Sequence, residues 1–326
     1  MRKVLLLLCM MALIGVSTAS ATIKWDMATA YPEYSFHTQN INQFVADVKK
    51  GTNGEFEIKV HSGQSLIKHP EIKSAIRNRQ IPIGEFLLAR LANENPVYKL
   101  DAIPFLASSF DEAKKLWQAQ KPYVEMLLEK QGLKVLFSVP WPPQGLYTKK
   151  SIESVDNLKT LRFRTYNKVT ERMAKLLGMV PTQTEATEMA TAFITGRVNS
   201  MMTSPAGGAN RKAWDFCTHF YHVQAWLPKN IIVVSNRSFQ KLEKSYQESI
   251  LKAAKVAEVR GWEMSKKDTD DGVQSLVKGG MQGIEPSNEL MKGLKEIGQK
   301  MTEEWLDEAG KDGLQVIEAY RSLLKK

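Results

Sequence analysis

The chain has 326 residues, of which 43% are hydrophobic and 25% charged, and its formal net charge is +10. This length exceeds one comfortable hydrophobic core, so we expect two lobes, and the composition is that of a folded globular protein rather than a disordered one. The basic residues are scattered, without a basic stripe or a nucleic-acid module, which argues against DNA or RNA as a partner.

The N-terminus has the order of a secretory signal peptide. Arg2 and Lys3 precede an apolar run over residues 4–16, and small residues follow as far as Ala21. We predict cleavage after Ala21 and a periplasmic mature protein, because the run is too short for a membrane anchor. Cys217 is then the one remaining cysteine, so no intramolecular disulfide is expected. The mature charge of +8 weakly favours an anionic ligand.

From residue 23 the chain alternates extended and helical patterns. Apolar residues recur with helical spacing over residues 44–48, and they alternate with polar ones over residues 56–60. A second helix opens at residues 70–71, and residues 81–84 return to an extended pattern. This rhythm predicts a mostly parallel sheet covered by helices.

The same pattern returns in a second block. Residues 135–139, 161–164 and 231–234 are predicted strands, and residues 168–177 are a predicted helix. The second block therefore predicts a second α/β lobe.

Long helical patterns follow. Residues 246–278 predict one long helix, or two in line, interrupted only by Gly261 and Gly272. Such an element could bridge both lobes. Residues 288–324 predict a further amphipathic helix.

The predicted architecture is a two-lobed α/β periplasmic binding protein fold. Each lobe has a mixed, mostly parallel sheet flanked by helices, and the long helix spans both. We place lobe I at residues 22–145 plus 235–275, and lobe II at residues 146–234 plus 276–326.

Motifs for cofactors and catalysis are missing from the sequence. It has no glycine-rich nucleotide or phosphate loop and no nucleophile elbow, so we expect no cofactor and no enzyme. His219 and His222 lack a supporting carboxylate or cysteine, which favours a structural pair over a metal site. Glu185 and Glu188 could be an acid and base pair, but this spacing is more typical of a solvated helix face.

One short segment is more informative. In the predicted strand within residues 157–167, Arg162 and Arg164 point to one side. At the end of a parallel strand, the Arg164 guanidinium would face a crevice between the lobes and could bind a carboxylate through two parallel hydrogen bonds. The alternative is a surface strand with two solvated arginines.

The sequence resembles the solute-binding proteins of tripartite ATP-independent periplasmic (TRAP) transporters, in the dicarboxylate-binding family, over essentially the whole mature length. The clearest match is Leu158-Lys159-Thr160-Leu161-Arg162-Phe163-Arg164. The resemblance implies that Arg164 is the carboxylate-binding arginine. Partial matches lie at residues 62–64, 84–86, 103–106 and 188–200.

Three positions depart from the family pattern. Ala190 stands where tyrosine is common, Ser204 where an asparagine often touches ligand, and Gln144 where a second arginine is frequent. These departures predict a larger and less ionic pocket. Trp141 and Trp226 could wall a bulkier acid, such as an aromatic or branched 2-oxo or 2-hydroxy acid, or could simply pack in the core.

We therefore predict that the protein binds a small organic carboxylate between the lobes, as a monomer, and delivers it to the membrane permease of a TRAP transporter. A ligand-sensing partner of a membrane receptor is one alternative, and a periplasmic α/β enzyme is another. The candidate ligand contacts are Arg164, Glu85, Gln144, Trp141, Ser204 and Asn230.

Overall fold

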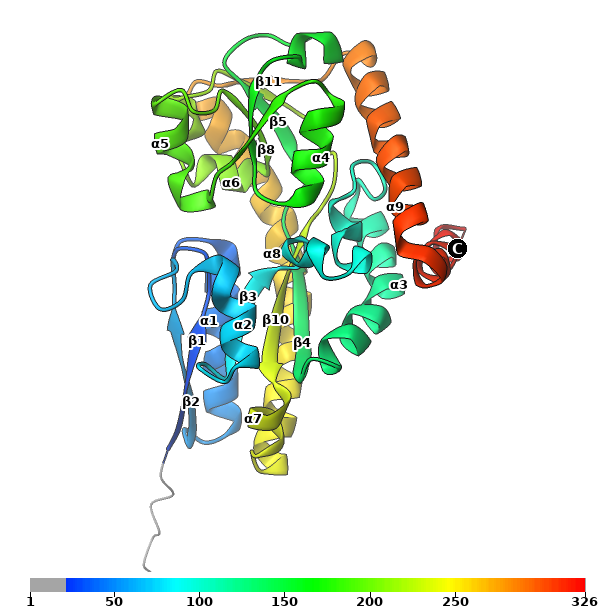
Figure 1. Ribbon diagram of the computed structural model, residues 1–326. Helices are drawn as coiled ribbons and strands as arrows, with labels where there is room; N and C mark the ends of the chain where they lie inside the picture. The colour runs from blue at the N-terminus through cyan, green and yellow to red at the C-terminus, as the bar shows by residue number, and fades with distance from the viewer. Residues whose placement is uncertain (1–21, 326) are drawn as a thin grey trace, which may run out of the picture.

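The computed structural model describes residues 22–325. The predicted signal peptide, residues 1–21, lies outside the described residues. The chain forms two sheets, one in each lobe, and helices cover them (Figure 1). The helices are α1 (Phe36–Gly51), α2 (Ile72–Arg77), α3 (Phe110–Glu129), α4 (Lys168–Leu176), α5 (Met189–Ile194), α6 (Pro205–Ala209), α7 (Asn236–Gln240), α8 (Lys244–Lys278) and α9 (Asn288–Leu324), with 3-10 turns η1 (His69–Glu71), η2 (Leu88–Asn93), η3 (Pro96–Ala102), η4 (Val155–Leu158), η5 (Ala186–Glu188) and η6 (Ala213–Asp215).

The first sheet has five strands. In spatial order they are β2 (Phe56–His61), β1 (Ile23–Ala28), β3 (Ile83–Leu87), β10 (Lys229–Ser235) and β4 (Leu133–Pro140). Strand β1 runs parallel to β2 and β3, whereas β10 runs antiparallel to β3 and β4. The strand predicted at residues 231–234 thus forms as part of β10. It lies in the first sheet, although the predicted lobe boundary would leave it in the second.

The second sheet has six strands. In spatial order they are β11 (Gln282–Ile284), β9 (His219–Tyr221), β5 (Gly145–Thr148), β8 (Ser200–Thr203), β6 (Arg162–Thr165) and β7 (Val180–Gln183). Strand β6 is parallel to both of its neighbours, and β5 is antiparallel to both of its own. Both sheets are mixed, as predicted, and the chain crosses between them after β4, after β9 and along α8.

The long helix α8 spans both lobes (Figure 1). It packs on α1 and β4 in the first lobe and on α6 and β11 in the second. Its two glycines lie where other chain segments approach closely. A Cβ atom would lie 2.5 Å from Val139 at Gly261, and 2.5 Å from the backbone nitrogen of Ala206 at Gly272. These residues, which interrupt the apolar pattern in the sequence, therefore allow the helix to contact each lobe.

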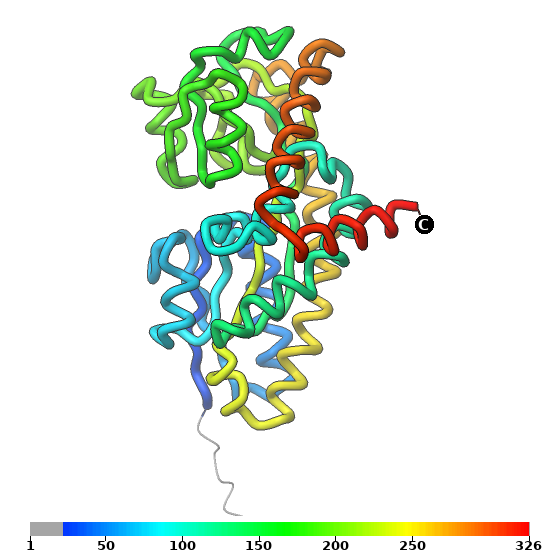
Figure 2. Tube along the Cα trace, turned by 45° about the vertical axis from the view of Figure 1, so that its right-hand side comes forward, coloured from blue at the N-terminus to red at the C-terminus, as the bar shows by residue number. Residues whose placement is uncertain are grey.

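Helix α9 bends at Gly310, where φ is 58° (Figure 2). That left-handed conformation is accessible to glycine at little cost, so the element predicted as one helix is two helical segments joined at an angle. No helix within residues 22–325 is long and apolar enough to cross a membrane.

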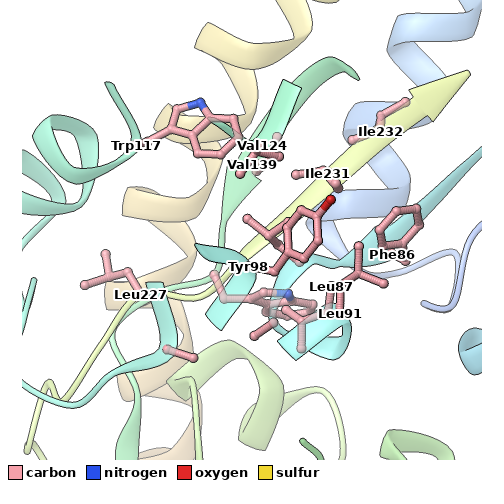
Figure 3. Close-up of a cluster of buried hydrophobic side chains, with 14 of the residues drawn as sticks. Phe86, Leu87, Leu91, Tyr98, Trp117, Val124, Val139, Leu227, Ile231 and Ile232 are labelled. Atoms are coloured by element: carbon pink, nitrogen blue, oxygen red, sulfur yellow. The ribbon is translucent and has the colours of Figure 1, made fainter. Parts of the chain in front are cut away.

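The core of the first lobe surrounds the central strand β10, whose seven residues are all buried. Ile231 and Ile232 lie among side chains from β3, η2, η3 and α3, including Phe86, Tyr98 and Trp117 (Figure 3). A strand with neighbours on both edges and elements on both faces has no solvated side, which is why its sequence reads as a continuous apolar run. This rigid core fixes the first wall of the cavity described below.

Candidate functional site

A cavity of about 60 Å³ lies between the two lobes. At about 10–15 Å³ for each water, this volume suits a compact molecule the size of roughly four to six waters. Both lobes and the crossing segments contribute to its wall. The lining residues are Tyr31, His69, Leu87, Arg90, Trp141, Gln144, Arg164, Tyr166, Glu185, Ala186, Met189, Thr203, Ser204, Gly207, Arg211 and Pro228.

Arg164 reaches the cavity from the carboxyl end of β6, which is a usual ligand position in α/β sheets. Its side chain is 5% exposed, its Nε donates to the carbonyl oxygen of Thr184 at 3.0 Å, and its guanidinium lies 4.5 Å from the centre of the Tyr166 ring. Burial lowers the pKa of Arg164 to about 10, so the group remains charged at neutral pH. Its two terminal nitrogens have no hydrogen-bond partner among residues 22–325, which leaves them available to a carboxylate.

Two further arginines line the cavity, and the sequence did not single them out. Arg211, just after α6, donates to the carbonyl oxygens of Ala186 and Gly207, both at 2.9 Å. Arg90 lies in η2 of the first lobe. The expectation of a less ionic pocket is therefore wrong, because these arginines offset the loss of the family's second arginine.

Arg90 also joins the two lobes. Its terminal nitrogens donate to both carboxylate oxygens of Glu185, at 3.0 and 3.2 Å. Glu185 follows β7 in the second lobe, so this two-pronged ion pair exists only when the lobes lie together. Glu185 is thus part of the cavity wall, whereas Glu188 pairs with Arg197 at the surface as a solvated residue.

Four of the six predicted contact residues line the cavity together: Arg164, Gln144, Trp141 and Ser204. The Gln144 amide nitrogen donates to the Pro142 carbonyl oxygen at 2.8 Å. The Ser204 hydroxyl oxygen accepts from the backbone N–H of Gly207, which caps α6 and leaves the hydroxyl proton available.

The other two predicted residues, Glu85 and Asn230, lie behind the cavity wall. Asn230 donates to Glu85 at 2.9 Å, and its carbonyl oxygen accepts from the Tyr31 hydroxyl and the Trp141 indole. They therefore support two lining side chains rather than line the cavity themselves. Trp226 is buried and does not line the cavity, which agrees with the alternative that it packs in the core.

Comparisons with known proteins identify the family of the chain. The model of the family described as bacterial extracellular solute-binding protein, family 7, matches residues 27–308. The chain belongs to this family. An extracytoplasmic solute receptor of Bordetella pertussis that binds pyroglutamic acid is 43% identical, covers 92% of this chain and 99% of its own, and superposes with a TM-score of 0.90.

Other relatives place this family 7 protein among the TRAP solute-binding proteins. A TRAP solute-binding protein from an unidentified marine microbe, specific for pyroglutamate, is 36% identical, with 93% and 99% coverage and a TM-score of 0.90. A solute-binding protein of Albidiferax ferrireducens is 22% identical over 286 residues, 86% of this chain and 83% of its own. The resemblance to TRAP solute-binding proteins is confirmed.

In this family 7 protein, Glu85 is a buried acid beside the site. Burial raises its pKa to about 7, although hydrogen bonds from Thr29 and Asn230 oppose the rise. The folded protein therefore retains a proton between pH 4.5 and 7 that the unfolded chain releases, so Glu85 lowers stability progressively as pH rises through this window.

We expect Glu85→Gln to unfold like the wild type near pH 4.5 and to become more stable than it by about 3 kcal/mol at pH 8, since each pKa unit corresponds to about 1.4 kcal/mol. Urea unfolding of both proteins from pH 4.5 to pH 8 measures this. Glu57→Gln, at the exposed pair with Lys49, is the control. A stability difference between wild type and Glu85→Gln that does not change with pH would contradict the assignment.

Proposed function

We propose that this protein captures pyroglutamate in the periplasm and delivers it to the membrane permease of a TRAP transporter. The observation that carries the proposal is the buried Arg164, whose free terminal nitrogens face a compact cavity. Pyroglutamate is a five-membered lactam with one carboxylate, so it is small enough for this space. The two pyroglutamate-binding relatives, 43% and 36% identical, favour it over the bulkier aromatic acids considered from the sequence.

The charges of the cavity support an anionic ligand. Of its three arginines, Arg90 is paired with Glu185, which leaves Arg164 and Arg211 without a carboxylate partner in the wall. A bound carboxylate would accept two charge-assisted hydrogen bonds from Arg164, each contributing about 1.5–3 kcal/mol. The Ser204 hydroxyl can donate its free proton in a hydrogen bond to the ring carbonyl oxygen of the ligand.

Closure of the lobes would then signal that the site is occupied. A ligand held by Arg164 in the second lobe and by Tyr31 or Trp141 in the first favours the closed arrangement, which the Arg90–Glu185 pair also stabilises. The permease would bind this closed form, in which both lobes present one continuous surface.

The ligand would leave unchanged. Ser204 and His69 are the cavity's nearest match to a nucleophile and base. However, the His69 Nε2 atom accepts from the backbone N–H of Leu87 at 3.2 Å, so its lone pair is engaged. Among the described residues no group of three metal ligands forms either. These features support a binding role over catalysis.

A thermal-shift measurement tests the proposal. The protein without residues 1–21, stripped of ligand by unfolding and refolding, is heated with pyroglutamate or with its neutral amide. At a hundredfold excess over Kd, pyroglutamate should stabilise the fold by about 2.7 kcal/mol and raise Tm by roughly 5 °C or more. The amide should have little effect. No shift, or an equal shift with the amide, would refute pyroglutamate capture through the carboxylate.

A further inference from the structure

Two polar side chains of the first lobe turn towards a single atom. The Tyr31 hydroxyl and the Trp141 indole N–H both donate to the amide oxygen of Asn230, at 3.2 and 3.1 Å. Both residues also line the cavity, and their rings are in edge contact, 4.9 Å between centroids. The Tyr31 hydroxyl and the Trp141 indole N–H are therefore both engaged within the protein.

The orientation of the Asn230 amide is fixed from behind by Glu85. The Glu85 side chain is fully buried, and its two oxygens accept from Asn230 Nδ2, at 2.9 Å, and from the Thr29 hydroxyl. When Glu85 is ionised, a reversed amide would set its oxygen against a carboxylate oxygen and its nitrogen against the indole N–H, so two contacts would become repulsive. Glu85 thus directs the oxygen of Asn230 towards Tyr31.

This arrangement defines what Tyr31 can do for a ligand. A tyrosine hydroxyl has one proton and also accepts hydrogen bonds. Because that proton is donated to Asn230, the oxygen can only accept from a group in the cavity. The facing groups Arg164 and Arg211 are donors only, which divides the cavity into a donor side for the carboxylate and an acceptor position on the opposite lobe.

We propose that Tyr31, held by Asn230 and Glu85, accepts the ring N–H of the lactam and makes the site select acids that carry this N–H. The inference rests on the proposed function and adds the group that discriminates among small cyclic acids. A lactone of the same shape has a ring oxygen in place of the N–H. Its lone pairs would face those of Tyr31, leaving a buried acceptor unpaired.

Calorimetry with two ligands tests the assignment. Pyroglutamate and 5-oxotetrahydrofuran-2-carboxylate, its lactone counterpart, are titrated into the wild type and into Tyr31→Phe. We expect the wild type to bind the lactam at least about tenfold more tightly than the lactone, as sites built for an N–H reject analogues that lack it. In Tyr31→Phe, lactam binding should fall about tenfold while lactone binding changes little, so the preference disappears.

Tyr98→Phe is the matched control. The Tyr98 hydroxyl is also buried in the first lobe, but it has no hydrogen-bond partner among residues 22–325 and does not line the cavity. This variant should keep the wild-type preference. Equal binding of both ligands by the wild type would overturn the inference, and so would a preference that survives in Tyr31→Phe. Failure of the wild type to bind pyroglutamate at all would instead refute the proposed function.

Discussion

Replacing Arg164 with alanine is expected to weaken pyroglutamate binding at least about 100-fold, because two charge-assisted hydrogen bonds of about 1.5–3 kcal/mol each are lost. The loss should not be recovered by Arg164→Lys, since an ammonium cannot make the two-pronged contact that we propose for the guanidinium. Isothermal titration calorimetry of both variants measures the change in Kd.

Arg162→Ala is the control for this experiment. Arg162 lies two residues earlier on the same strand, but its side chain is exposed and does not line the cavity. This variant should bind like the wild type. An Arg164→Ala variant that is folded, as shown by an unchanged melting temperature without ligand, and that keeps wild-type affinity would contradict the role of Arg164 as the carboxylate clamp.

Arg164 could be predicted because its position depends on local features. The strand ends at Thr165, and Asn167 caps the following helix by accepting from the Thr170 N–H at 2.9 Å, so the chain direction at Arg164 follows from nearby residues. The resemblance then indicated Arg164, which is the one of the two strand arginines that lines the cavity.

Arg90 and Arg211 could not be predicted in this way. Arg90 lies in a 3-10 turn, and Arg211 follows a five-residue helix, so neither has a periodic pattern that fixes its direction. Each has a partner distant in the chain, Glu185 for Arg90 and the Ala186 carbonyl oxygen for Arg211, although Arg211 also donates to the nearby Gly207 carbonyl oxygen. An arginine within or beside a short turn gives no local signal of the cavity that it faces.

The assignment of strands to sheets shows the same contrast between local features, which the sequence predicts, and long-range contacts, which it does not. Alternation and apolar runs placed β4 and β10 correctly as strands, because side-chain periodicity is a local property. Which sheet a strand joins depends on long-range pairing. Strand β10 is separated from β4 by residues 141–228 and from β3 by a still longer stretch, so its place in the first sheet could not be read from its own sequence.

We expect the buried pair of Asp101 and Lys229 to dominate the stability of the first lobe at the point where the chain returns from the second lobe and enters β10. Both side chains are fully buried, and one Asp101 oxygen lies 3.8 Å from the Lys229 Nζ and accepts from the Lys229 backbone N–H at 2.7 Å. Burial lowers the pKa of Lys229, and the nearby Asp101 opposes that change. The Nζ atom has no hydrogen-bond partner among residues 22–325, so Asp101 supplies the compensating charge.

Asp101→Ala should therefore lower the free energy of unfolding by about 3–5 kcal/mol, because it leaves an uncompensated buried ammonium group. Adding Lys229→Met removes that charge and should restore most of the loss. Glu308→Ala, which breaks the partly exposed pair with Lys99, is the control and should cost less than about 1 kcal/mol. Urea unfolding at pH 7 compares the three variants.

If Asp101→Ala cost no more than the Glu308→Ala control, the ammonium would have to be stabilised by something other than Asp101. If the double variant were as unstable as the single one, the cost would come from the lost backbone hydrogen bond rather than from the charge.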